Sequence, residues 1–198
     1  MRQFSFVNGN YYHVMNRGVD GRPIFLDNTD RIRFLHALHS FNNQRRIHPI
    51  VGIAAYCLMD NHFHLLLKQL CEGGISAFLH KIGIGYVMYY NKRYERRGRL
   101  FQSTFHAVPV IANEHFLHLT RYIHLNPLEI PFPGWEVRGV PNIGAAEAFL
   151  KHYPWSSYQH YIGQRTDPVV DATDSLALFQ DQEDYESFLR EWMVHGRD

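Results

Sequence analysis

The sequence predicts an α+β protein with a ferredoxin-like, or split βαβ, antiparallel sheet that has helices packed on one side and one extra helix. The order of the apolar patterns is the first observation, because segments with strand and helix periodicity follow one another as β-α-β-β-α-β-α. Composition is the second, since 45% hydrophobic and 15% aromatic residues in a chain of 198 can fill one sizeable core. The RNA-recognition motif (RRM) shares this architecture.

The first strand, loop and helix are predicted from local composition. Tyr11–Arg17 is rich in β-forming residues and is expected as a strand. Gly18–Pro23 is rich in turn-forming residues, and Asp27, Asn28 or Thr29 can cap the helix that follows. The apolar positions of that helix recur at helical spacing, at Ile32, Phe34, Leu35, Leu38 and Phe41.

A β-hairpin is predicted next. His48–Met59 is a long apolar run typical of a buried strand, and His62–Gln69 is expected as its partner. Asp60 and Asn61 between them are expected to form a tight turn.

A long helix follows the hairpin in this prediction. Gly73 and Gly74 end the second strand, and Ser76 is expected to open a helix that ends near Arg96 or Gly98. Its apolar stripe consists of Phe78, Leu79, Ile82, Tyr86, Tyr89 and Tyr90.

One more strand and two more helices complete the pattern. Phe105–Ile111 is expected as an edge strand, because Pro109 cannot donate a backbone hydrogen bond. Asn113 is expected to cap a helix that stops at Pro127. Asp181–Val194 is typical of an acidic amphipathic helix.

The charge is unevenly distributed although the net charge is only +1. Asp167–Asp198 holds nine acidic and two basic residues, a charge of −7, which leaves 18 basic and 10 acidic residues, or +8, in the rest. A basic body with an acidic tail favours binding to a polyanion, although an ordinary fluctuation in charge could give the same numbers.

Composition also indicates the cellular compartment in which the protein is expected. No stretch approaches the roughly 20 apolar residues of a membrane span, and the first residues lack the apolar run of a signal peptide. Cys57 and Cys71 are too few for a disulfide framework or a four-cysteine zinc site. We therefore expect a soluble, cytoplasmic protein with no membrane partner.

His62 and His64 are the first candidates for chemistry. Residues two apart on a strand project from the same face, about 7 Å apart, so both imidazoles can converge on one divalent ion. Phe63 would point to the opposite, buried face. Because the chain contains 14 histidines, the pair could equally be a chance feature of a half-solvated sheet face.

Tyr122 and Asn126 are the second candidates, because residues i and i+4 share one face of a helix. An asparagine oxygen is a hard ligand that suits Mg²⁺ or Mn²⁺, and a tyrosine oxygen beside such an ion is a plausible nucleophile. The alternative is that Tyr122 is an amphipathic core residue and Asn126 a helix cap.

A basic segment at 91–102 is the third candidate. Arginines grip phosphate and aromatic rings stack on unpaired bases, so the segment is a potential DNA-binding surface. The alternative is a solvated helix end whose cations complement the helix dipole. The residues predicted to bind DNA are, within this segment, Lys92, Arg93, Arg96, Arg97, Arg99, Phe101 and Gln102, and, outside it, Arg17.

Taken together, these motifs resemble the single-tyrosine HUH (IS200-like) transposases, and among them the REP-associated tyrosine transposases. The resemblance runs from about Tyr11 to Tyr158 in the order of the family. The motifs that carry it are Tyr12-His13-Val14, Asn16-Arg17-Gly18, Met59–Leu67, Tyr90-Asn91, Arg97–Gln102, Arg121–Pro127 and Trp155–Tyr158.

The resemblance implies an activity and a site. His62, His64 and Asn126 match the ligands of a Mg²⁺ or Mn²⁺ ion, and Tyr122 matches the nucleophile. The implied reaction is cleavage and rejoining of single-stranded DNA through a 5′-phosphotyrosine link, on DNA recognised as a hairpin with a single-stranded flank. It further implies a catalytic domain at 1–130 and a C-terminal extension at 131–198.

Some features depart from the family pattern or remain open. Asp60 stands where proline is common before Asn-His, and the acidic end after Asp167 matches no motif. The sequence does not decide between monomer and homodimer. A non-catalytic DNA- or RNA-binding protein of RRM-like fold is the alternative function. A His-x-His hydrolase of the amidohydrolase kind is disfavoured, because its barrel needs about 250 residues.

Overall fold

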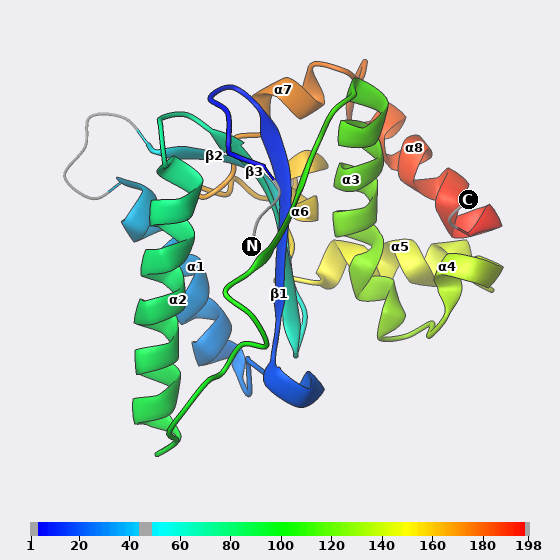
Figure 1. Ribbon diagram of the computed structural model, residues 1–198. Helices are drawn as coiled ribbons and strands as arrows, with labels where there is room; N and C mark the ends of the chain where they lie inside the picture. The colour runs from blue at the N-terminus through cyan, green and yellow to red at the C-terminus, as the bar shows by residue number, and fades with distance from the viewer. Residues whose placement is uncertain (1–3, 44–48, 197–198) are drawn as a thin grey trace.

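The computed structural model describes residues 4–43 and 49–196, and these form the predicted ferredoxin-like sheet (Figure 1). The strands are β1 (Tyr11–Arg17), β2 (Val51–Leu58), β3 (His62–Gln69) and β4 (His106–Pro109). They pair antiparallel in the order β2-β3-β1-β4. The predicted element order is therefore confirmed, and β1 and β3 have the predicted bounds.

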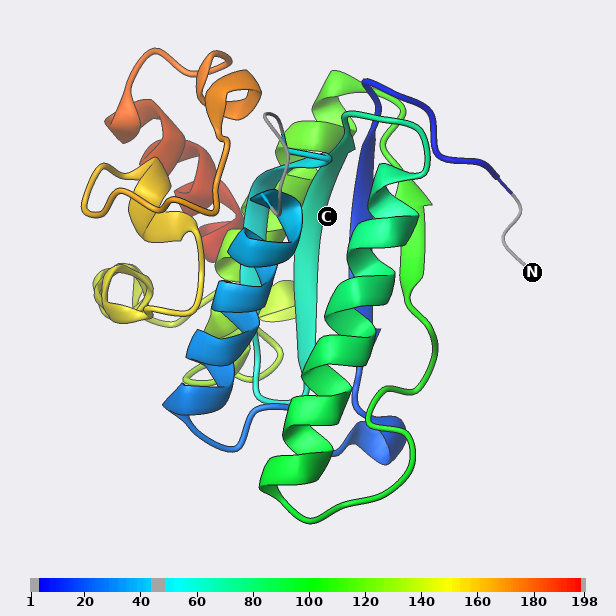
Figure 2. The same ribbon diagram turned by 90° about the vertical axis from the view of Figure 1, so that its left-hand side faces the viewer.

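Two long helices cover one face of the sheet, as Figure 2 shows. They are α1 (Asn28–Asn43) and α2 (Gly74–Arg93), and a short 3-10 turn, η1 (Val19–Gly21), follows β1. Strand alternation turns Tyr12, Val14 and Phe63 toward these helices, where they join the largest hydrophobic core. Asp27 caps α1, because its side-chain oxygen accepts a hydrogen bond from the Asp30 backbone N–H at 3.1 Å.

The opposite face of the sheet is covered by α3 (Asn113–Leu125), which continues into the 3-10 turn η2 (Asn126–Glu129). Phe116, Leu119 and Ile123 of α3 pack against Cys57 and Leu66 of the sheet. The extra helix thus packs across the sheet on the side away from α1 and α2.

The rest of the chain packs around α3 and over the sheet beside it (Figure 1). Its helices are α4 (Trp135–Arg138), α5 (Ile143–His152), α6 (Tyr158–Tyr161), α7 (Thr173–Leu176) and α8 (Gln182–His195). Leu125 and Leu128 share a buried cluster with Trp135 and Trp192. The predicted acidic helix is confirmed as α8, whose first turn is capped by Asp181.

The outer edge of β2 is also covered by this segment. Leu58 N donates to Trp155 O at 2.8 Å, and Ser157 N donates to Tyr56 O at 3.0 Å. Hydrogen bonds and shared core therefore tie the segment after residue 130 to the sheet. None of the helices in the described ranges is long and apolar enough to cross a membrane.

The boundaries differ from the prediction where local signals compete. Helix α2 begins at Gly74 rather than Ser76, because Gly73 adopts the left-handed conformation that precedes the helix. Asn113 is the first residue of α3 and not its cap. Strand β4 is shorter than predicted, and Ile32 is 58% exposed instead of buried. The expected strand start at His48 lies outside the described residues.

Candidate active site

The register between β1 and β3 brings predicted site residues together on the sheet face that α3 covers. Arg17 lies opposite His62, and Met15 lies opposite His64. The rings of His62 and His64 share this face, with centroids 5.0 Å apart. The sequence therefore predicted the geometry of the pair correctly.

Asn61 fixes the orientation of the His62 ring. Its Nδ2 donates to Gly21 O at 3.1 Å, so its Oδ1 is the acceptor that lies 2.7 Å from His62 Nδ1. Burial lowers the pKa of His62, which is therefore neutral near neutral pH and keeps a lone pair on Nε2. Asn126 Oδ1 lies 3.3 Å from that nitrogen. Two acceptor atoms thus face each other, an arrangement that favours a cation between them.

His13 supports the second histidine of the pair. Its Nε2 lies 2.9 Å from His64 Nδ1, and the two rings stack at an interplanar angle of 17°. Burial, followed by the proximity of His13 and His62, holds the pKa of His64 well below its usual value. The neutral tautomer that donates from Nδ1 to His13 leaves His64 Nε2 with the lone pair that a metal ligand needs.

His13 is absent from the predicted site residues, although a signal for it exists in the sequence. His13 and Met15 are two apart on β1, and Met15 pairs with His64. Strand alternation therefore places His13 on the face of His64 once the register is known. Without the register, His13 reads only as part of the Tyr12-His13-Val14 motif.

Tyr122 reaches the same face from α3. Its half-buried ring lies edge-on to His64 and His13, at centroid distances of 5.2 Å and 6.0 Å. Asn126 follows one turn later and keeps right-handed helical dihedrals, with its N–H bonded to Tyr122 O. The predicted i, i+4 pair is therefore formed, and both side chains converge on the histidines.

Two buried residues beside Tyr122 hold α3 in place. The Arg121 guanidinium lies 4.1 Å and 3.9 Å from the ring centroids of Phe188 and Trp192 on α8. His124 is fully buried, with Nδ1 2.5 Å from Tyr185 Oη and Nε2 2.7 Å from Ser157 Oγ. Burial lowers the pKa of His124 to about 3, so the ring is neutral. Polar contacts to the C-terminal segment thus flank the tyrosine on both sides.

A pocket of about 500 Å³ lies over His62, His64 and Tyr122. Arg17 brings a positive charge to it, whereas Asp60 and Glu129 are acidic members of its lining. The other lining residues are Met15, Gly21, Pro23, Met59, Asn61, His62, His64, Tyr122 and Ile130. A phenol, two neutral imidazoles and a guanidinium thus share one cavity, a set that suits chemistry on a phosphodiester.

The basic segment lies outside this pocket, near the C-terminal end of α2 and the start of the following loop. Lys92, Arg97, Arg99 and Gln102 are exposed there. Arg96 is half-buried over the Tyr90 ring, with 5.6 Å between the guanidinium carbon and the ring centroid. Arg17 is thus the predicted DNA-binding residue that lies among the histidines.

Two residues of the predicted DNA-binding set make contacts within the protein that compete with DNA binding. Arg93 forms ion pairs of 2.6 Å with Asp27 and 2.8 Å with Asp30, which neutralise its charge and join α2 to α1. Phe101 is only 9% exposed and packs against Phe63 and Tyr86, so its ring belongs to the core instead of being displayed for base stacking. For these two residues the structure does not support the prediction.

One pair of the candidate ligands has the spacing that a divalent ion needs. In the described ranges there is no group of three or more His, Cys, Asp or Glu side chains that could hold a metal, and the candidate set instead combines His62, His64 and the amide of Asn126. Two ligand atoms about 2.1 Å from one ion and at normal coordination angles lie roughly 3.0–3.4 Å apart. The 3.3 Å between His62 Nε2 and Asn126 Oδ1 falls within that interval.

Comparisons with known proteins identify the family and a solved structure of the same fold. The family model described as "Transposase IS200 like" matches residues 6–126, from just before β1 to Asn126. A solved structure of a REP-associated tyrosine transposase bound to a REP hairpin has the same fold. It is 19% identical, with a TM-score of 0.58, over 88% of this chain and 93% of that chain. A search of curated proteins found no match. Because the family model spans more than half of the sequence, the chain belongs to the IS200-like transposase family.

Proposed function

We propose that this protein is a tyrosine transposase of the REP-associated kind, which cleaves and rejoins single-stranded DNA with Tyr122 as its nucleophile. One observation carries the proposal. Tyr122 lines the same pocket as His62 and His64, and Asn126 Oδ1 lies 3.3 Å from His62 Nε2. Family membership supports a transposase activity in general.

His62, His64 and Asn126 would hold a Mg²⁺ or Mn²⁺ ion. When bound, the ion would neutralise charge on the scissile phosphate and stabilise the charge that develops during cleavage. The burial that lowers the pKa of both histidines supports this role, because neutral imidazole is the form that ligates a metal.

The side chains of the protein carry the covalent step. The Tyr122 oxygen attacks the phosphorus and loses its proton, a new P–O bond forms, and the bond to the 3′ oxygen breaks. The leaving oxygen takes up a proton as a free 3′-hydroxyl, while the 5′ end stays bound as phosphotyrosine. Attack by another 3′-hydroxyl reverses the step and needs no nucleotide cofactor.

Arg17 and the exposed cations Lys92, Arg97 and Arg99 would bind the DNA backbone. Arg17 adjoins His62 in the pocket, so it is suited to a phosphate next to the scissile one. The solved structure of similar fold was determined with a REP hairpin, and we propose hairpin-forming DNA as the substrate here. We propose that residues 1–130 form the catalytic domain and that residues 131–198 are an extension of it. We also propose that the protein acts in the cytoplasm.

The alternative of a non-catalytic RRM-like binder is disfavoured by the covered sheet. RNA-recognition motifs stack bases on aromatic residues of an open sheet face. Here α1 and α2 cover one face, and α3 with the C-terminal helices covers the other (Figures 1 and 2). The described sheet therefore lacks the open aromatic face of an RNA-recognition motif, and the accessible part of its α3 side is the active-site pocket.

Incubation with labelled single-stranded DNA from the regions that flank its own gene tests the proposal. We expect a protein–DNA adduct that survives denaturation, requires Mg²⁺ or Mn²⁺, and disappears in Tyr122→Phe. The variant Tyr153→Phe is a matched control, because Tyr153 is a buried tyrosine outside the pocket lining. Adduct formation that persists in Tyr122→Phe would remove Tyr122 as the nucleophile.

A further inference from the structure

Helix α2 contains two interior glycines, Gly83 and Gly85, and packing against a neighbouring helix accounts for only one of them. Glycine in a helix interior is less stable than alanine, so its presence calls for a reason. At Gly85 a Cβ atom would lie 3.0 Å from the Phe41 ring, so close helix packing favours glycine there. At Gly83 a Cβ atom would meet nothing within 4 Å, and the backbone is helical. Neither packing nor backbone geometry accounts for Gly83.

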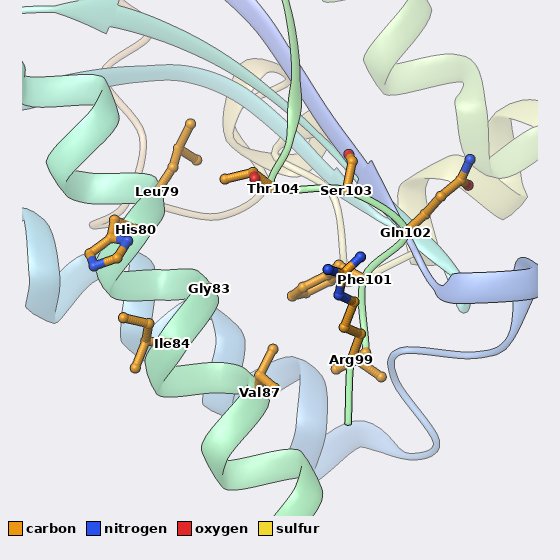
Figure 3. Close-up of a pocket in the computed structure, with 11 residues that line it drawn as sticks. Leu79, His80, Gly83, Ile84, Val87, Arg99, Phe101, Gln102, Ser103 and Thr104 are labelled. Atoms are coloured by element: carbon orange, nitrogen blue, oxygen red, sulfur yellow. The ribbon is translucent and has the colours of Figure 1, made fainter. Parts of the chain in front are cut away.

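Gly83 lies on the wall of a pocket of about 560 Å³ between α2 and the segment 99–104, shown in Figure 3. This volume is typical of small-molecule and cofactor sites, which occupy roughly 300–1,000 Å³. The α2 side is largely apolar, through Leu79, Ile84 and Val87. The facing side is polar, with Arg99, Gln102, Ser103 and Thr104.

The polar side of the pocket is anchored to β1. Asn16 Nδ2 donates to the carbonyls of Ser103 and Thr104 at 3.0 Å and 2.8 Å. Gln102 N donates to Arg17 O at 2.8 Å, and Phe101 bridges to Gly18. The exposed side chains of Gln102, Ser103 and Thr104 are therefore carried by a fixed backbone.

The pocket is connected to the active site through shared residues. Gln102 also lines a second depression together with Arg17 and Gly21, and Arg17 and Gly21 line the active-site pocket. Three depressions thus adjoin one another around the end of β1. A chain of nucleotides that starts at Tyr122 could follow them past Arg17 to Gly83.

We propose that this pocket receives an unpaired base of the DNA strand whose phosphate is bound at Tyr122. This proposal rests on the proposed function. The bare backbone at Gly83 lets a flat ring lie directly against α2, flanked by Leu79 and Val87. The Thr104 side chain points toward α2 across the pocket (Figure 3), where its hydroxyl can bond the hydrogen-bonding edge of the base, and Arg99 matches its phosphate. The lining of this pocket contains no acidic side chain, which suits an anionic strand, whereas Asp20 lines the depression beside it.

The variant Gly83→Leu tests the proposal, because its side chain would extend into the open space of the pocket. Leucine is a better helix former than glycine, so we expect the variant to fold with an unchanged or higher melting temperature. Ala77→Leu adds the same bulk at an exposed position of α2 outside the pocket lining and serves as the control. Thr104→Val is a second variant, which removes the hydroxyl on the side of the pocket that faces α2 without filling space, and it should also weaken binding.

Binding is measured by fluorescence anisotropy in the Tyr122→Phe background, with a labelled oligonucleotide that carries a REP-type hairpin and single-stranded flanks. Because base stacking is worth about 1–3 kcal/mol per base, we expect Gly83→Leu to weaken binding about 5- to 160-fold and Ala77→Leu to leave it unchanged. One abasic position in a flank should weaken binding to the Ala77→Leu protein and have no further effect on Gly83→Leu.

Equal affinity of Gly83→Leu and Ala77→Leu would overturn the pocket assignment, as would an abasic effect that persists in Gly83→Leu. These readouts need no cleavage, so failure of the pocket is distinguishable from failure of the proposed function. Loss of the covalent adduct in the wild type would reject the transposase chemistry and leave the binding comparison intact.

Discussion

Removal of the His13 contact tests whether the buried histidine pair organises a metal site. His13 Nε2 lies 2.9 Å from His64 Nδ1, and both side chains are buried. His13→Leu keeps an apolar side chain in the space but leaves His64 Nδ1 without its partner. Loss of such a supporting hydrogen bond typically lowers metal affinity 10- to 100-fold, or about 1.4–2.7 kcal/mol.

The assay is a titration of the protein with Mn²⁺, followed by the electron paramagnetic resonance signal of the free ion. His13→Gln should recover much of the affinity, because a glutamine oxygen can accept the hydrogen bond from His64. His106→Ala, an exposed histidine on β4, is the control for loss of a histidine as such. If His13→Leu binds Mn²⁺ as tightly as the wild type, His13 does not position His64 for a metal.

Three further predictions address the ligand set, the DNA surface and the buried clamp on α3. Asn126→Ala should weaken Mn²⁺ binding at least 10-fold and abolish metal-dependent nicking of a hairpin oligonucleotide, whereas Asn126→Asp should retain binding; equal affinity in the alanine variant would remove Asn126 from the ligand set. The double variant Arg97→Ala, Arg99→Ala should reduce the slope of log affinity against log salt by about 0.7 per arginine, as measured by anisotropy, and an unchanged slope would mean that both are solvated surface. The pKa of His124 in the folded protein is about 3, below the ordinary value of 6.5. The unfolded chain therefore takes up the proton first as the pH decreases. The free energy of unfolding consequently falls between about pH 6.5 and pH 3. This residue contributes up to about 1.4 kcal/mol per pH unit to that fall, so His124→Gln should flatten the pH dependence of the unfolding free energy, measured with denaturant in EDTA, and an identical slope would contradict the assignment.

Much of the fold was predictable because periodicity reports burial directly. Strands β1 and β3 were predicted with the observed bounds, since one run is rich in β-forming residues and the other has Phe63 and the histidines on opposite faces. Helix boundaries were less predictable. The left-handed Gly73 moves the start of α2, and one-residue signals such as Asn113 do not distinguish a cap from a first helical residue.

The candidate site was predictable only in part, because its remaining members depend on contacts distant in sequence. Arg93 pairs with Asp27 and Asp30, more than sixty residues earlier in the chain. Phe101 belongs to a segment that reads as a basic helix end, yet the backbone bridges to Gly18 and buries the ring. His13 required the pairing register of β1 with β3. Local patterns contain none of this information.

The clamp on both sides of Tyr122 has a consequence for strand exchange. Arg121 is held between Phe188 and Trp192, and His124 lies between Tyr185 and Ser157. A DNA end attached to Tyr122 would therefore be carried by a helix that the C-terminal segment contacts on both sides of the tyrosine. We expect the covalent end to stay in place while the released 3′-hydroxyl strand departs and the incoming one arrives. In this protein we expect the DNA strands to move during the reaction while α3 keeps its position.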